Sequence, residues 1–141
     1  MTSHFATAEE AQQVFYQAIE RADLAQMMTV WAEDDDIVCI HPGGPRHTGI
    51  EEVRESWRRI FTRGPELKFK LLAERRVPGR MLSVHSVVER IAYVRDGFPP
   101  ASAIATNIFV RSDDRGWQLL VHHASPIPDE QASEGPPSVL H

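Results

Sequence analysis

The chain has 141 residues and a net charge of −5, and 42% of its residues are hydrophobic while 25% are charged. This length fits one globular domain, and this composition excludes a disordered or fibrous protein. The basic residues are scattered along the chain rather than gathered in one stripe, which argues against nucleic acid as a partner.

Signals for membranes and for disulfide bonds are missing from the sequence. No apolar run approaches the roughly 20 residues that cross a bilayer, and the first residues lack the charged and apolar pattern of a signal peptide. Cys39 is the single cysteine, so neither an internal disulfide nor a multi-cysteine zinc site can form. We therefore expect a cytoplasmic protein that does not bind membranes.

Two helices are predicted at the start of the chain. A capping box begins at Thr7, and the apolar residues after it recur at helical spacing, which predicts a first helix over about residues 8–22. A second capping signal at Asp23 begins a short helix that ends near Ala32. The acidic run 33–36 that follows is interpreted as a solvated loop.

A short strand, a rigid turn and a third helix are predicted next. Residues 37–41 are rich in β-branched side chains, and the run Pro-Gly-Gly-Pro at 42–45 fits the interior of neither a helix nor a strand. A third capping signal begins at Thr48. The apolar residues after it keep a helical period until Gly64 and Pro65 end the helix.

From residue 67 onward the pattern changes to strands. Apolar and polar residues alternate, and Asp96-Gly97 is a strong hairpin signal, so we expect an antiparallel meander of four strands. From Pro126 the chain is rich in proline, which predicts one domain over 1–126 and a flexible tail over 127–141. The four strands are expected at residues 67–71, 81–94, 101–111 and 117–125.

This order of elements resembles the nuclear transport factor 2-like superfamily. The stretch from Asp23 to Asp35 looks like that family's segment of Asp-Leu, a hydrophobic residue, Trp-Ala and two acids. His41-Pro42-Gly43-Gly44 and the run from Gly116 to Ser125 resemble its SnoaL-like branch, and the second run also resembles the association domain of calcium/calmodulin-dependent kinases. The resemblance implies a cone-shaped α+β barrel, with three N-terminal helices packed on a curved antiparallel sheet around a pocket.

The same resemblance implies two candidate catalytic residues. In ketosteroid isomerase-like members the position that matches His41 is a carboxylate acting as general base, and an imidazole can perform the same proton transfer. Asn107 matches a hydrogen-bond donor to the substrate oxygen. The structural alternatives are that His41 ends a strand and that Asn107 satisfies backbone groups. The isomerases place a tyrosine of the first helix beside their acid; the matching residue here is Phe15, and Tyr16 is expected to face elsewhere.

Two adjacent histidines lie on the last predicted strand, so their side chains must point to opposite faces of the sheet. We expect His123 to face the pocket as a third catalytic residue, because Trp117 and Ser125 share its face, whereas a shift of one residue would place His122 there instead. His85, in the middle of its strand, either joins this group or lies on the open face.

Other candidates are expected to form the pocket wall or the core. A metal site is not expected, since no two histidines are spaced for joint coordination, and no organic cofactor is implied. Cys39 could pair with His41 as a nucleophile, but a lone buried cysteine usually acts as a small hydrophobe. The residues expected to line the pocket, besides the catalytic candidates, are Phe15, Trp31, Trp57, His85, Phe109 and His122.

These observations predict a protein with a pocket for an unidentified small molecule. The first hypothesis is acid–base catalysis without a cofactor, of the isomerase, cyclase or dehydratase type, on a small carbonyl or cyclic substrate. The alternative is a binding or oligomerisation module without catalysis, like the kinase association domain. The strand 81–94 carries apolar residues on both faces, so we also expect a homodimer that covers the outer face of the sheet.

Overall fold

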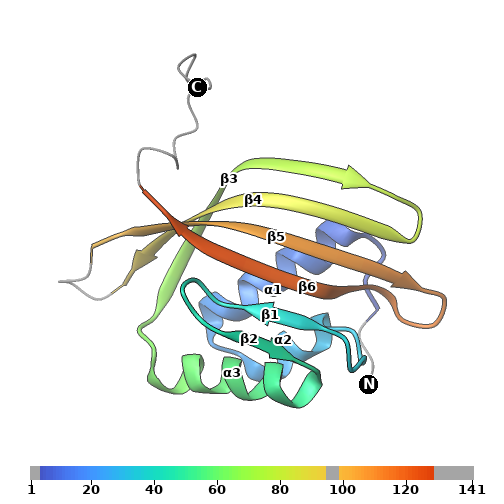
Figure 1. Ribbon diagram of the computed structural model, residues 1–141, viewed down its shortest axis with the longest axis horizontal. Helices are drawn as coiled ribbons and strands as arrows, with labels where there is room; N and C mark the ends of the chain where they lie inside the picture. Colours follow the sequence, from blue (N-terminus) through green and yellow to red (C-terminus); the bar gives the residue numbers. More distant parts are fainter. Residues whose placement is uncertain (1–3, 95–98, 129–141) are drawn as a thin grey trace.

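A computed structural model describes residues 4–94 and 99–128. Three helices lie on one side of a sheet that bends over them (Figure 1). In the described part of the chain no helix is long and apolar enough to cross a membrane. The elements, in chain order, are α1 (Ala8–Arg21), α2 (Leu24–Val30), β1 (Val38–Ile40), β2 (Arg46–Thr48), α3 (Ile50–Arg63), β3 (Leu67–Pro78), β4 (Leu82–Tyr93), β5 (Ala101–Ser112) and β6 (Gly116–Ile127).

The helices begin and end where local chemistry dictates. The Thr7 side chain accepts a hydrogen bond from the backbone N–H of Glu10 and caps α1, and the Asp23 side chain does the same for α2. Ala22 ends α1 in the left-handed conformation, with φ of 50°. Gly49 precedes α3 at φ of 85° without a side-chain cap, so the predicted capping by Thr48 is wrong. The acidic residues 33–36 form the exposed connection expected between α2 and β1.

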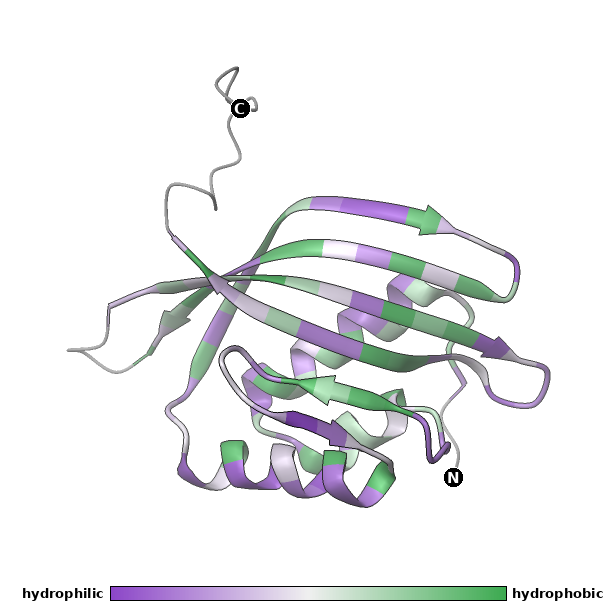
Figure 2. Cartoon of the chain, viewed as in Figure 1, coloured by the Kyte–Doolittle hydropathy of each residue, from purple (hydrophilic) through white to green (hydrophobic). Residues whose placement is uncertain are grey.

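The six strands form one mixed sheet in the order β2-β1-β6-β5-β4-β3. The meander from β3 to β6 is antiparallel, as predicted, but β1 pairs with β6 in parallel, with Cys39 opposite His122. Hydrophobic and hydrophilic residues alternate in short stretches along the long strands (Figure 2). The parallel pairing brings the end of β1 and the centre of β6 together, although about 80 residues separate them.

Three expectations about strand boundaries change. Residues 46–48 form β2, a strand that the sequence pattern did not predict, and β3 continues to Pro78 rather than ending at Leu71. Pro126 and Ile127 belong to β6, where they pair with β5. Asp96-Gly97 and residues 129–141 lie outside the described residues, so the hairpin turn and the tail remain predictions.

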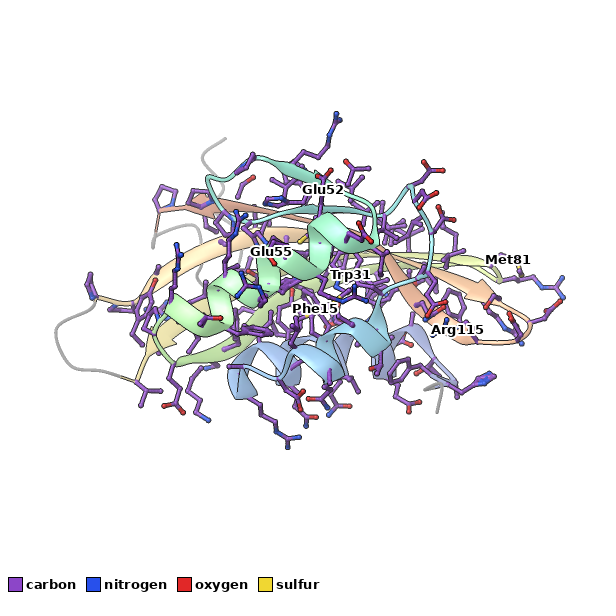
Figure 3. All side chains as sticks on the ribbon, turned by 90° about the horizontal axis from the view of Figure 1, so that it is seen from below. Phe15, Trp31, Glu52, Glu55, Met81 and Arg115 are labelled. Carbon is purple, nitrogen blue, oxygen red and sulfur yellow. The ribbon has the colours of Figure 1, made fainter. Side chains whose placement is uncertain are left out.

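The core fills the space between the helices and the concave face of the sheet. Phe15 and Trp31 are fully buried and lie at the centre of the molecule, whereas Met81 and Arg115 lie toward one end (Figure 3). On β4 the residues Ser83, His85, Val87 and Glu89 are buried toward the helices. This inner face of β4 therefore carries three polar side chains, which must find partners inside the molecule.

Candidate functional site

A cavity of about 110 Å³ lies between α1, α3 and the inner face of the sheet. Its walls are mainly apolar, and its polar side chains are His41, Glu89 and His122. Such a wall, with a few converging polar groups, is the usual form of a small-molecule site. The residues around it are Ile19, His41, Pro42, Trp57, Ile60, Leu67, Phe69, Glu89, Ile91 and His122.

His41 follows the last residue of β1 and is held by α3. Its Nε2 atom lies 3.0 Å from Oγ of Ser56 and 3.7 Å from Sγ of Cys39, and its ring packs edge-to-face on Trp57 at 4.6 Å between ring centres. Burial, and secondarily the nearby His47, lower the pKa of His41 to about 4. The imidazole is therefore neutral at pH 7.

His122 lies on β6 at the back of the cavity and is held by a neighbouring strand. Its Nδ1 atom is 2.6 Å from Oδ1 of Asn107 on β5, and its ring contacts Phe15 at 4.8 Å between ring centres. Burial, with smaller contributions from His41 and His123, lowers the pKa of His122 to about 3. His122 is thus a second neutral imidazole at neutral pH.

Within residues 4–94 and 99–128, Glu89 is the one acidic side chain in the cavity wall. It is 3% exposed, and its Oε2 atom accepts a hydrogen bond of 2.6 Å from the hydroxyl of Tyr16. Burial raises the pKa of Glu89 to about 7, although the hydrogen bond from Tyr16 opposes that shift. A carboxyl group that titrates near neutral pH can donate or accept a proton, which is a property of catalytic acids and bases.

A network of hydrogen bonds behind the cavity holds these groups in place. The Asn107 Nδ2 atom donates to Oε1 of Gln12 and to the hydroxyl of Tyr16, both at 3.1 Å. Nδ1 of His85 lies 3.1 Å from the same Gln12 oxygen, and Nε2 of His85 lies 2.9 Å from Oγ of Ser83. Every member of this network is buried, so each loses water and gains protein partners.

The structure separates the predicted site residues into three groups. His41, Trp57 and His122 line the cavity. Asn107 lies behind the cavity, and its amide nitrogen donates to Gln12 and Tyr16. These contacts do not support its expected role as a hydrogen-bond donor to the substrate. Phe15, Trp31, His85 and Phe109 do not line the cavity; all four are fully buried, with His85 in the network and the three aromatic residues in the core.

The prediction that His123 faces inward is wrong, and a β-bulge is the reason. Phe109 pairs with Leu119, but the next pair is Ile108 with Val121, which leaves Leu120 as an extra residue in β6. The extra residue shifts the alternation of side chains by one position. His122 therefore points inward beside Asn107, and His123 is exposed on the outer face.

The sequence pattern did not indicate that Glu89, Tyr16 and Ser56 belong to the site. Tyr16 was expected to face away from the site, but it is 5% exposed and bonds to both Glu89 and Asn107. The sequence did contain an indication for Glu89, because its carboxyl group lies on the same strand face as Val87 and His85. A charged residue at a position that alternates with buried ones indicates a group with an internal partner.

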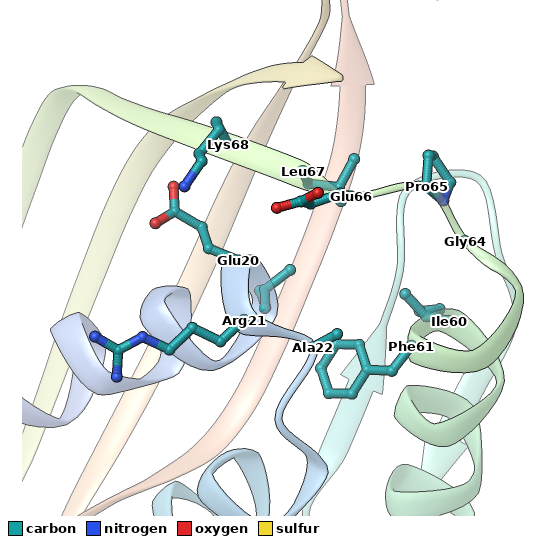
Figure 4. Close-up of a pocket in the computed structure, with 11 residues that line it drawn as sticks. Glu20, Arg21, Ala22, Ile60, Phe61, Gly64, Pro65, Glu66, Leu67 and Lys68 are labelled. Carbon is teal, nitrogen blue, oxygen red and sulfur yellow. The ribbon is translucent and has the colours of Figure 1, made fainter. Parts of the chain in front are cut away.

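A wider cleft of about 460 Å³ adjoins the cavity and shares Ile19, Ile60 and Leu67 with it. Figure 4 shows Ile60 and Phe61 of α3 at one side of this cleft, and Glu20 and Lys68 extending toward each other at the other. The cleft is larger than the cavity, but the groups with displaced pKa values lie in the cavity.

Known structures define the class of protein to which this fold belongs. A structure from Thiobacillus denitrificans, provisionally named a calcium/calmodulin-dependent protein kinase type II association domain, is 32% identical with a TM-score of 0.81, and the match covers 89% of this chain and 98% of that one. A structure from Streptomyces avermitilis, provisionally named a dehydratase of the NTF2-like family, is 29% identical with a TM-score of 0.76, covering 84% and 91%. The chain has the fold of the nuclear transport factor 2-like superfamily.

The chain can also be assigned to one family within that superfamily. Residues 8–130 match the model of the SnoaL-like domain, and the chain belongs to this family. Among curated proteins, F-box protein SKIP8 of Arabidopsis thaliana is 31% identical over 112 residues, which is 79% of this chain and 46% of that protein. The chain thus spans about half the length of the curated relative that it matches.

Proposed function

We propose that the protein catalyses proton transfer on a small, uncharged carbonyl compound without a cofactor. The observation that carries this proposal is Glu89, a buried carboxyl group with a pKa of about 7 in the wall of an apolar cavity that also holds two neutral histidines. An acid and a base that face one cavity are what enolisation requires. The Streptomyces avermitilis relative, provisionally named a dehydratase, is consistent with an enzyme on this fold.

In the proposed reaction protonated Glu89 is the acid and His41 is the base. The lone pair of His41 takes a proton from the carbon next to the carbonyl, and the electrons of that C–H bond form a C=C bond. The carbonyl oxygen then takes the proton of Glu89, which gives an enol, a carboxylate and an imidazolium. The imidazolium then returns its proton to carbon while the Glu89 carboxylate takes back the O–H proton of the enol, which regenerates the carbonyl and both side chains. Return to the same carbon is proton exchange, and return to the far carbon of a conjugated dienol, formed from an unsaturated ketone, is an isomerisation. The carboxylate and the imidazolium attract each other, which helps a histidine of low basicity to accept the proton.

This assignment of roles fixes the pH dependence. Activity requires protonated Glu89, so the rate should fall as the pH rises through about 7. Activity also requires neutral His41, so it should fall as the pH drops below about 4. The rate should therefore be highest between these values, because the acid and the base are both in the required form there.

Exchange of the α-protons of cyclopentanone in deuterium oxide, followed by proton NMR, tests the proposal. A cavity of about 150 Å³ holds benzene, so this smaller cavity of about 110 Å³ suits a ring of about five atoms. The wild type should accelerate exchange. Glu89→Gln should reduce the acceleration by about 10² to 10⁴, the usual contribution of a general acid or base.

The adjacent histidines provide the matched control. His122→Gln should impair exchange because His122 lines the cavity, while His123→Gln should leave it unchanged because His123 is exposed on the other face. No acceleration by the wild type across pH 4 to 8, or equal rates for the wild type and Glu89→Gln, would refute the catalytic proposal.

A second candidate function is assembly, which two observations favour. The Thiobacillus denitrificans relative is named for an association domain. The outer face of the sheet also exposes apolar side chains, with Leu82 47% and Ile104 42% exposed, beside a small cluster formed by Leu72, Val88 and Ile127. We propose that this face pairs two copies of the chain as a homodimer. The two functions are compatible, since the cavity lies on the opposite face.

A further inference from the structure

The direction of the hydrogen bonds around His41 follows from Ser56. The hydroxyl of Ser56 lies 2.8 Å from the backbone oxygen of Val53, which can only accept, and 3.0 Å from Nε2 of His41. A hydroxyl has one proton to donate. Both contacts are hydrogen bonds only if Ser56 donates to Val53 and Nε2–H of His41 donates to Ser56. The neutral ring then carries its lone pair on Nδ1, the other nitrogen.

The direction of the hydrogen bond between His122 and Asn107 follows in the same way from the other contacts of Asn107. Tyr16 donates its proton to the Glu89 carboxyl group, so its oxygen accepts from the Asn107 amide. That amide nitrogen also donates to Oε1 of Gln12. Oδ1 is left to face His122, and an oxygen without hydrogen accepts, so Nδ1–H of His122 is the donor. The lone pair of His122 lies on Nε2, for which the described part of the chain supplies no hydrogen bond.

We propose that Ser56 and Asn107 are positioning residues that hold His41 and His122 in opposite tautomers, so that both histidines offer a lone pair to a ligand. Glu89 complements them. Its Oε2 atom already accepts from Tyr16, so the proton of the neutral carboxyl group resides on Oε1. When Glu89 is protonated, the cavity therefore presents two acceptors and one donor, all on uncharged groups.

This arrangement restricts the class of ligand, and the restriction rests on the proposed function. Among the residues that the structure describes, no lysine or arginine lines the cavity, and both histidines are neutral at pH 7. An anion would meet two lone pairs and a carboxyl group that is partly ionised, without any cation to compensate. An uncharged carbonyl compound accepts from Glu89 and presents C–H or O–H groups to the histidines. Carboxylates and phosphates should be excluded.

Nitrogen NMR of the histidine rings tests the tautomers without any turnover. Two-bond correlations between ring protons and ring nitrogens, recorded at pH 7 on the full chain, distinguish the two neutral forms. His41 should show protonated Nε2 and His122 protonated Nδ1. The reverse form of either ring, or a mixture in the wild type, overturns the proposal for that residue. If the tautomers are found but cyclopentanone does not exchange, only the proposed function fails.

Variants identify the residues that impose the tautomers. Ser56→Ala should convert His41 to a mixture of forms and leave His122 unchanged, while Ser56→Thr, which keeps the hydroxyl, should restore the wild-type spectrum of His41. Asn107→Leu should release His122 in the same way, and Ser125→Ala, at an exposed site on β6, is the control. An unchanged His41 spectrum in Ser56→Ala contradicts the role of Ser56, and an unchanged His122 spectrum in folded Asn107→Leu contradicts that of Asn107.

Ligand binding provides a measurement that does not depend on the variants. Cyclopentanone should shift the ring signals of His122 in the wild type, and cyclopentanecarboxylate should bind at least 10-fold more weakly than cyclopentanecarboxamide, which has the same size but no charge. Equal or tighter binding of the carboxylate in the cavity would overturn the proposed set of two acceptors and one donor. Weaker binding of the carboxylate, together with the expected tautomers, supports it.

Discussion

Replacing Glu89 by glutamine should change how the stability of the protein depends on pH. Burial raises the pKa of Glu89 from 4.5 to about 7, so between these values the folded state holds a proton that the unfolded state has released. Stability falls with increasing pH wherever the folded state binds more protons. The contribution of Glu89 is thus fully present below about pH 4.5 and is lost as the pH rises through about 7. Glutamine does not titrate.

The size of the effect follows from the shift. About 2.5 pKa units at about 1.4 kcal/mol each give roughly 3 kcal/mol. Glu89→Gln should therefore gain roughly this much stability relative to the wild type between pH 4 and pH 8. His41 and His122 contribute pH dependence of the opposite sign, because burial lowers their pKa values. The wild type and Glu89→Gln both retain these histidines, so most of their contribution cancels when the stabilities of the two proteins are subtracted.

Urea unfolding at a series of pH values measures the difference. The control is Glu66→Gln, at an exposed glutamate just before β3, which should follow the wild type at every pH. If the curves of the wild type and Glu89→Gln run parallel from pH 4 to pH 8, then Glu89 titrates normally. The reasoning from its burial, and with it the proposed acid, would be refuted.

Three further predictions concern other parts of the structure. Ala22 ends α1 at φ of 50°, so Ala22→Gly should raise the free energy of unfolding by up to about 1 kcal/mol, while Ala25→Gly inside α2 should lower it by about 1 kcal/mol, both measured by urea unfolding. His122→Gln should reduce the loss of stability on acidification from pH 6.5 toward pH 3, since the unfolded wild type binds a proton there and the folded His122 does not; an acid transition identical to that of the wild type would contradict the lowered pKa. The wild type should sediment at twice the monomer mass of 15.9 kDa, and Ile104→Lys on the outer face should shift it toward the monomer; a wild type that remains monomeric at micromolar concentration would exclude the homodimer.

Local signals in the sequence were sufficient to predict most of the helices and strands. The caps at Thr7 and Asp23 and the helical period of the apolar residues located α1 and α2, because these signals act over a few residues. Alternation located the long strands for the same reason. The family resemblance at His41, directly before Pro42, predicted one histidine of the site, and His41 does lie in the cavity wall.

What the sequence could not determine depended on contacts between distant segments. One extra residue at Leu120 decided whether His122 or His123 faces inward, and a bulge is visible only when two strands are paired. The parallel pairing of β1 with β6 placed His122 beside Cys39 and close to His41. Glu89 became a candidate acid only when α1 supplied Tyr16 and the assembled core removed water from its carboxyl group. The sequence by itself determined the family and most of the elements, while tertiary structure decided the protonation states, because burial is a property of the whole assembled fold.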